Sequence, residues 1–412
     1  MFEYKEEYKY PTCACLNVTD DCNLACVYCF VQQKPNFMTL DVAKQAIDYL
    51  VNNLNNKRKL DPNDDSIVNI SFFGGEPTIM WEKIILPTVE YAESTYPGLV
   101  HFDITTNGTL LNAERIKYLK EHDISILLSI DGPKEVQDKN RPCKNGQGSF
   151  ELLSKNIPLI LENFPHTTFR STISQYSCEH MFDSYLFAIQ QGFSNIFFCP
   201  NVREKWSEEN KNKLHEQINK IFTYFILSFM NGEQPIQCTA IDTAFQRILE
   251  HDLQVHYNEF NTLNPNRRKT RCGLGTTSIA ISHNGDLFSC QEQNSRDTNE
   301  YFYIGNIYEG INEKLHYNIL NDYDKPEELI CENKKLCENC LLRQTCIDDM
   351  CPSVSYDMFN TFMIRPEVDC LMAQWMVENA LIAMDILVNK EKNDTFKNYL
   401  NDLYFRYKKE VE

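Results

Sequence analysis

Three cysteines lie close together near the start of the chain, in the stretch CNLACVYCF (22–30). Cys22, Cys26 and Cys29 have the spacing CxxxCxxC and follow a short β-rich run at 15–19. A structural zinc site takes four ligands, usually as two CxxC pairs, and no histidine or fourth cysteine completes this group nearby. Thiolates are soft ligands, and a [4Fe–4S] cluster held by only three of them keeps one iron open. The spacing therefore favours an iron–sulfur cluster with one open position.

Glycines and small polar residues follow the next three predicted strands. The stretches are Gly74-Gly75-Glu76-Pro77 after 67–73, Thr106-Asn107-Gly108 at the end of 101–106, and Ser129-Ile130-Asp131-Gly132-Pro133 at the end of 125–130. Glycines let a backbone approach a ligand closely, and small polar side chains can meet hydroxyl or carboxylate groups. We expect these strand ends to form one ligand site, with a plain turn as the alternative for the first.

An arginine follows the third of these strand ends. Arg141, within DKNRP, offers a planar fork that can hold a carboxylate through two hydrogen bonds, and a surface ion pair is the alternative. Arg170, in the predicted strand 167–173, is a weaker candidate for the same charge.

Eight more cysteines gather between residues 272 and 370. Seven follow the pattern Cys272-x12-Gly285-x4-Cys290, then Cys337-x2-Cys340-x5-Cys346-x4-Cys351, and finally Cys370, whereas Cys331 stands outside it. Clustered thiols in a reducing compartment are more often metal ligands than disulfides, and this pattern alone fits zinc as well as iron.

The remaining single cysteines have a different expected role. Cys143, Cys178 and Cys238 are expected to be small buried hydrophobic residues. Cys199 ends the predicted strand 195–199, where it could face the cavity.

The elements that carry these residues alternate between strands and helices. Helices are expected at 40–54 after the N-cap Thr39, and at 80–95, 112–121, 149–163 and 180–191. Repeated alternation implies right-handed βαβ units and a parallel sheet. We therefore predict an α/β fold whose parallel sheet is either open or closed into a partial (β/α)6 barrel, two units short of a full barrel; in a barrel the CxxxCxxC loop would lie at the C-terminal mouth.

The alternation stops after Pro200. Helices are expected at 208–231 and 239–256 with no strand between them, followed by a linker at 264–272. Short strands in TTSIAIS (276–282) and DLFSC (286–290) lie among the later cysteines, and 371–409 is helical again. The predicted parts are an N-terminal extension (1–12), the barrel (13–200), a helical linker region (201–267), a cysteine-rich domain (268–370) and C-terminal helices (371–412).

Composition restricts the possible partners. A net charge of -18 argues against general affinity for nucleic acid or an anionic membrane. No run of 18 apolar residues is present, and the charged start MFEYKEEYKY is not a secretory signal. We expect a cytoplasmic protein that binds neither nucleic acid nor membrane.

The motifs resemble those of the radical SAM superfamily, whose signature is CxxxCxxC with an aromatic residue before the last cysteine, here Tyr28. The resemblance implies that the open iron binds S-adenosylmethionine (SAM) and that an electron from the cluster cleaves it to methionine and a 5′-deoxyadenosyl radical, which abstracts a substrate hydrogen. The cofactor-binding residues that it implies are Tyr28, Gly74, Gly75, Glu76, Thr106, Asn107, Ser129, Asp131 and Arg141.

The late cysteines resemble the SPASM extension of radical SAM peptide-modifying enzymes, which carries two auxiliary [4Fe–4S] clusters and so brings the expected number to three. The family run ends with x3 where this chain has x4, CIDDMC. By resemblance the outer cluster is held by Cys337, Cys340, Cys346 and Cys370, and the inner cluster by Cys272, Cys290 and Cys351. The fourth inner position is either open or filled by Cys331.

Two subclasses of such enzymes compete. Sulfatase maturases carry an acidic residue directly after the counterpart of Cys290 and an extra cysteine shortly before that of Cys272, whereas this chain has Gln291, then Glu292, and PNRRKT. We therefore favour an oxidoreductase that matures a ribosomally made, cysteine-containing peptide through thioether crosslinks, of the sactipeptide or ranthipeptide type. Oxidation of Cys or Ser to formylglycine is the alternative, and a non-catalytic Fe–S or zinc protein is an alternative of another class.

Further partners follow from the same resemblance. Only twelve residues precede Cys13, where crosslinking maturases commonly carry a peptide-recognition domain. A leader peptide is then expected to be bound by a separate protein, by the C-terminal helices, or not at all. A reductant such as flavodoxin or ferredoxin is expected to supply the electron.

Overall fold

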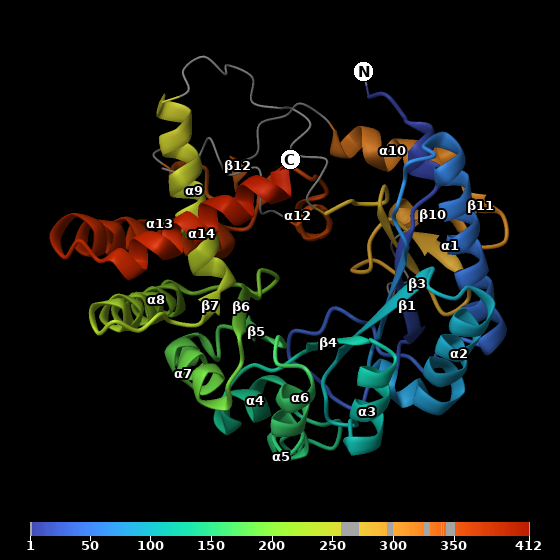
Figure 1. Cartoon of the computed structure of the whole chain (residues 1–412), viewed down its shortest axis with the longest axis horizontal. Helices are drawn as coiled ribbons and strands as arrows, with labels where there is room; N and C mark the ends of the chain where they lie inside the picture. The colour runs from blue at the N-terminus through green and yellow to red at the C-terminus, as the bar shows by residue number, and fades with distance from the viewer. Residues whose placement is uncertain are drawn as a thin grey trace.

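The computed structural model of the chain describes residues 2–256, 272–294, 300–324, 330–338, 340, 342 and 351–411 (Figure 1). All six strands predicted for the barrel are present. They are β1 (Cys13–Thr19), β2 (Val68–Gly74), β3 (Val100–Thr106), β4 (Ser125–Leu128), β5 (Thr168–Ile173) and β6 (Asn195–Pro200). The first four pair in parallel and in order, β5 pairs in parallel with β6, and a single parallel bridge between Ser129 and Arg170 joins the two groups. The partial α/β barrel is confirmed.

The helices between these strands follow the outside of the arc (Figure 1). They are α1 (Leu40–Leu60), η2 (Pro77–Met80), η3 (Trp81–Ile85), α2 (Leu86–Thr95), α3 (Ala113–Glu121), α4 (Lys134–Asn140), α5 (Phe150–Leu153), α6 (Ile157–Asn163), η4 (Cys178–His180) and α7 (Met181–Gln191). The Thr39 hydroxyl caps α1 by accepting the Val42 N–H at 3.3 Å, as predicted. Buried aliphatic residues of α1, such as Ile47 and Leu50, pack in the core with Leu16 of β1.

The helix expected at 149–163 was wrong as a single element, because α5 and α6 are separate. Pro158 lies in the first turn of α6 and has no N–H to continue a helix from α5. The chain instead turns at Asn156, whose side-chain amide donates to the carbonyls of Gly108 and Leu111 at 3.0 and 2.8 Å. Helix α4 was not predicted.

A strand separates the two helices expected without one. Between α8 (Glu208–Met230) and α9 (Thr239–His256) lies β7 (Gln237–Cys238), which pairs in parallel with β6. The prediction of no intervening strand was wrong, since two residues are too few to display the alternation that marks a strand in sequence.

The cysteine-rich region continues the barrel sheet. β8 (Ser278–Ile281) pairs in parallel with the free edge of β1, and β9 (Asp286–Phe288), β10 (Tyr303–Asn306) and β11 (Gly310–Ile311) follow as an antiparallel meander. Beside them lie η6 (Glu300–Phe302), α10 (Glu313–Tyr323) and the N-terminal η1 (Glu6–Lys9), with the Tyr4 hydroxyl hydrogen-bonded to Nδ1 of His316 at 2.8 Å. The order β11-β10-β9-β8-β1-β2-β3-β4 therefore crosses the predicted domain boundaries.

The remaining elements are β12 (Ile330–Cys331), α11 (Lys334–Glu338), α12 (Pro352–Phe359), β13 (Ile364–Arg365), α13 (Glu367–Met384), η8 (Asp385–Lys390) and α14 (Asp394–Val411). The helix Glu367–Lys390 is long and apolar enough to cross a membrane by length and composition, which qualifies the expectation that the chain has no such segment. A core helix of a folded protein passes the same test, and α13 packs against α8 and α9.

Candidate active site

The cysteine loop begins directly after β1, at the C-terminal end of the parallel strands. Cys22 is buried, Cys26 is half-buried and Cys29 is exposed. Two backbone hydrogen bonds hold the loop against the segment after α4, from Ala25 N–H to the Pro142 carbonyl at 2.7 Å and from Val27 N–H to the Asn140 carbonyl at 3.0 Å. These bonds fix the backbone that carries the three cysteines at the C-terminal end of the strands.

The three thiols lie within electrostatic reach of one another. Burial raises the pKa of Cys22 to about 12 and that of Cys26 to about 11, so an approaching metal must displace their protons. Among the residues described, no three ligands converge on a single ion. A cubane cluster holds each thiolate on a different iron, so convergence on one point is not required, and the donor set fits a [4Fe–4S] cluster better than zinc.

The two glycines after β2 pack directly onto the segment that leads to Cys22. Gly75 N–H donates to the Thr19 carbonyl at 2.7 Å, and Glu76 N–H donates to the Asp21 carbonyl at 2.9 Å. A Cβ on Gly74 would lie 2.1 Å from the Thr19 oxygen, and one on Gly75 would lie 2.1 Å from the Asp21 oxygen. The N–H groups of Gly75 and Glu76 are therefore used in contacts between the two backbones. Only the carbonyl groups of this stretch are left to accept a hydrogen bond from the amino group of a ligand.

Glu76, which follows β2, is linked to the end of β3 and through it to the cysteine loop. Its buried carboxylate accepts the Thr106 hydroxyl at 2.7 Å and the Asn107 N–H at 2.8 Å, while burial raises its pKa. The Asn107 amide in turn reaches Asn23 Oδ1 at 3.0 Å and Cys22 Sγ at 3.9 Å. Glu76, Thr106 and Asn107 therefore position the cysteine loop.

A buried ion pair lies on the other side of the loop. Arg141 Nη2 contacts Asp131 Oδ1 at 3.1 Å, the Tyr28 hydroxyl donates to Asp131 Oδ2, and the guanidinium lies over the Tyr28 ring at 5.3 Å. Arg141 therefore forms an ion pair, which was the alternative expected from the sequence, but the pair is buried and not at the surface. Nε of Arg141 is buried without a hydrogen-bond partner, so the group retains a donor for an anion.

Ser129 and Arg170 face each other across the bridge that joins β4 to β5. The guanidinium of Arg170 lies 5.9 Å from the Phe197 ring centroid. Arg170 is also an electrostatic neighbour of Cys199 at the end of β6.

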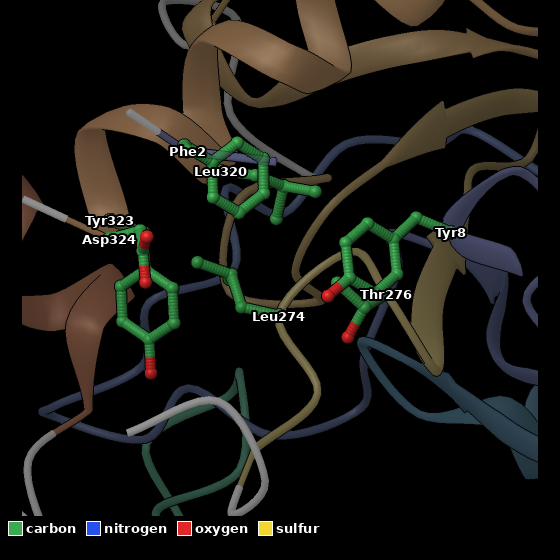
Figure 2. Close-up of a pocket in the computed structure, with 7 residues that line it drawn as sticks. All are labelled: Phe2, Tyr8, Leu274, Thr276, Leu320, Tyr323 and Asp324. Carbon is green, nitrogen blue, oxygen red and sulfur yellow. The ribbon is translucent and has the colours of Figure 1, made fainter. Parts of the chain in front are cut away.

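The structure brings Cys272, Cys290 and Cys351 together, as expected for an inner trio. Each lies within electrostatic reach of the others, and burial raises the pKa of Cys290 to about 12. Ser353 hydrogen-bonds to the Cys290 thiol, and Tyr323 to the Cys272 thiol. Tyr323 and Leu274 also line a cavity of about 40 Å³, together with Phe2 and Tyr8 of the N-terminal segment (Figure 2).

The outer group is brought together only in part. Cys337 Sγ accepts the Cys331 N–H at 2.9 Å, and the Cys331 and Cys370 thiols are hydrogen-bonded to each other. Cys340 accepts a hydrogen bond from the Gln374 amide at 3.0 Å. Cys331 thus contacts two cysteines of the outer group, and Cys346 lies outside the described residues.

An ion-pair network that sequence inspection missed connects the two cysteine regions. Arg203 Nη2 binds Glu292 Oε2 at 2.8 Å and Asp357 Oδ2 at 3.0 Å, and its guanidinium lies 5.9 Å from the Phe30 ring in the cysteine loop. Glu292 is an electrostatic neighbour of both Cys29 and Cys290. No local signal could have found this network, because its members are 89 and 154 residues apart.

The single cysteines divide as predicted, with one exception. Cys178 and Cys238 are buried. Cys143 is only half-buried and donates to the Gly148 carbonyl at 3.7 Å, so the prediction for it was wrong; it lies in the open turn after α4. Cys199 lines a cavity of about 310 Å³ between β6, α9 and α13.

The comparison with protein families decides what the cysteine loop belongs to. Residues 16–176 match the sequence model described as the radical SAM superfamily. This part of the chain is a radical SAM domain. It contains the cysteine loop, the strand ends and the Asp131–Arg141 pair.

Curated proteins similar to this chain include a sulfatase-maturating enzyme and a cyclopropyl synthase. A cysteine-type anaerobic sulfatase-maturating enzyme of Clostridium novyi is 26% identical over 52% of this chain and 59% of its own length. The radical SAM cyclopropyl synthase TigE of Paramaledivibacter caminithermalis is 21% identical over 92% of this chain and 74% of its own. The chain spans only about half to three-fifths of the length of two of the curated relatives it matches.

A solved structure shares the fold of most of the chain. Native anSMEcpe with bound AdoMet and Cp18Cys peptide superposes with a TM-score of 0.68, covering 92% of this chain and 99% of that one at 18% identity. At this identity the likeness establishes the fold alone.

Proposed function

We propose that this protein is a radical SAM enzyme that oxidises a cysteine-containing, ribosomally made peptide by forming thioether crosslinks. The observation that carries the proposal is the pairing of two open thiol trios, Cys22, Cys26 and Cys29 in the radical SAM domain and Cys272, Cys290 and Cys351 beyond it. The first trio could hold the cluster at which the radical reaction begins, and the second could hold a cluster that serves as electron acceptor.

In the radical SAM domain, Cys22, Cys26 and Cys29 would hold a [4Fe–4S] cluster. With SAM bound, this group supplies a 5′-deoxyadenosyl radical after one-electron reduction. The carbonyls of the Gly74-Gly75 turn would accept the SAM amino group, and Arg141 would offer Nε to its carboxylate while Asp131 and Tyr28 hold the guanidinium in place. Ser129 lies at the adjacent strand end, where a ribose hydroxyl could be bound.

The inner trio supports thioether formation. Its sulfurs come from three separate segments, and Cys331 contacts cysteines of the outer group. A [4Fe–4S] cluster bound by only three protein thiolates has one iron without a protein ligand, and that iron could take a substrate thiolate and keep it next to a substrate carbon, which favours bond formation by proximity. We propose two auxiliary clusters, and so three in all.

Formylglycine formation remains the second candidate because Glu292 lies near Cys29 and Cys290. That reaction requires a base, and the carboxylate of Glu292 is held by Arg203 at 2.8 Å. To act as that base, Glu292 would have to leave this ion pair, which favours the thioether proposal.

The proposed partners are a precursor peptide, a reductant such as flavodoxin or ferredoxin, and a separate leader-recognition protein. We further propose that the reaction takes place in the cytoplasm.

The test is an anaerobic assay of the reconstituted chain with SAM, dithionite and a short cysteine-rich peptide encoded beside it. Formation of deoxyadenosine together with loss of two hydrogen atoms per crosslink in the peptide mass is expected. A cysteine-to-aldehyde change would instead identify formylglycine formation. If fully iron-loaded protein forms no deoxyadenosine, the proposal of a radical SAM reaction is wrong.

A further inference from the structure

Cys331 is held in a fixed position at the start of the outer cysteine group. It ends β12, which pairs in parallel with β13 so that Cys331 is opposite Arg365. Hydrogen bonds flank it on both sides, from Ile330 N–H to the Met363 carbonyl at 3.0 Å and from Glu332 N–H to the Arg365 carbonyl at 2.8 Å. Its side chain is 2% exposed. The backbone therefore determines where this thiol lies.

The neighbours of Cys331 are other thiols. Its N–H donates to Cys337 Sγ at 2.9 Å, and its thiol is hydrogen-bonded to that of Cys370. Cys370 lies in the first turns of α13, which begins directly after β13, so the β12–β13 pair sets the separation of the two sulfurs. A buried cysteine that only fills space, such as Cys238, has no second thiol in contact among the residues described.

Hydrogen bonds to sulfur surround the same group. The Gln374 amide, one turn beyond Cys370 on α13, donates to Cys340 Sγ at 3.0 Å. N–H donors aimed at cysteine sulfurs are what the surroundings of an iron–sulfur cluster provide, because they stabilise the negative charge on the ligated thiolates. Cys331, Cys337, Cys340 and Cys370 thus supply four thiols with such donors on two of them.

We propose that Cys331 is a ligand of the outer cluster, together with Cys337, Cys340 and Cys370. It takes the position that family resemblance gives to Cys346. This rests on the proposed function, since it presumes that the outer group holds an iron–sulfur cluster. As a consequence, Cys331 is not available as a fourth ligand of the inner cluster.

The test compares iron and sulfide content and the EPR spectrum of full-length protein after anaerobic reconstitution. Wild type is expected to bind about twelve irons. Cys331→Ala leaves the outer cluster three thiolates, so its EPR signal is expected to change or its four irons to be lost, whereas Cys346→Ala is expected to keep about twelve irons and the wild-type spectrum. Cys238→Ala, which removes an equally buried thiol at β7, is the matched control and is expected to keep about twelve.

Two further measurements separate ligation from a structural role. Cys331→Ser keeps a hydrogen-bonding group next to Cys370, so an unchanged EPR spectrum with full iron content in this variant would overturn the proposal. The same conclusion would follow if Cys346→Ala lost one cluster, because the fourth position would then belong to Cys346. A disulfide between Cys331 and Cys370 in peptide maps of the anaerobic wild type would also overturn it.

These results are distinguishable from failure of the proposed function. That failure would appear in the wild type itself, as four or fewer irons per chain or as no deoxyadenosine, before any Cys331 variant is compared. Circular dichroism of each variant shows whether lost iron reflects lost fold.

Discussion

The cysteine loop and the C-terminal cysteines reach their positions by different routes. Cys22, Cys26 and Cys29 are neighbours in sequence, and the ends of β2 and β3 hold the loop through Gly75, Glu76 and Asn107. The C-terminal thiols come from separate segments that meet through elements as short as β12 and β13. A thiol site can thus be specified by local spacing on a rigid sheet or by long-range pairing of short pieces, and the second kind should be easier to disturb.

Replacing Cys22, Cys26 and Cys29 together with Ala should have the largest effect. Without these thiols the radical SAM domain has no ligands for its cluster, so deoxyadenosine formation should fall below detection. It is measured by chromatography after anaerobic incubation with SAM and dithionite. The matched variant with Cys272, Cys290 and Cys351 replaced should still form deoxyadenosine but give little modified peptide; equal loss in both would break the distinction between the two regions.

Asp131→Ala tests the buried side of the cysteine loop. It leaves the Arg141 guanidinium buried without its carboxylate and removes the acceptor of the Tyr28 hydroxyl. Breaking a buried ion pair costs about 3–5 kcal/mol, which chemical denaturation can measure. Glu151→Ala, which removes one partner of the exposed pair with Lys134, should cost far less, because solvent screens an exposed pair. A similar cost for both variants would contradict the role assigned to the buried pair.

Gly75→Ala tests how tightly β2 holds the loop. The added Cβ would meet the Asp21 oxygen at 2.1 Å, so the backbone before Cys22 must shift. We expect a loss of about 1–3 kcal/mol in the free energy of unfolding and reduced iron loading of the first cluster. Gly98→Ala has open space around its Cβ and only the strain of φ +73°, which costs about 1–2 kcal/mol. Unchanged iron loading in Gly75→Ala would show that the contact is not needed.

His316 should make the C-terminal region sensitive to acid. Burial lowers its pKa to about 4, whereas an unfolded histidine has a pKa of about 6.5. Between about pH 6.5 and pH 4, His316 is protonated in the unfolded chain but neutral in the folded chain. The free energy of unfolding therefore decreases as the pH falls through this range. The decrease from pH 7 to pH 5 should be about 2 kcal/mol. Thermal unfolding of His316→Gln should show a smaller decrease than wild type, and the partly exposed His122→Gln serves as control; parallel curves for His316→Gln and wild type would refute the assignment.

Features that depend only on residues close together in the sequence could be predicted. The six barrel strands are apolar runs bounded by turn residues, and the cysteine loop follows the first of them, so both could be predicted. The two-residue β7 and the break at Pro158 could not be separated from their surroundings by periodicity. Arg203, Glu292 and Asp357 meet only in the folded chain, and the place of Cys331 depends on the pairing of β12 with β13.

The pairing of β8 with β1 also constrains the order of folding. Cys13 to Leu16 pair with β2 on one edge and with Ser278 to Ile281 on the other. During synthesis, the first strand of the barrel must therefore wait with an open edge until residues 278–281 have left the ribosome. Contacts so distant in sequence slow folding, and an unpaired edge is a place where nascent chains associate wrongly. A chain cut after residue 200 would keep that edge exposed permanently, and aggregation of such a fragment is the expected result.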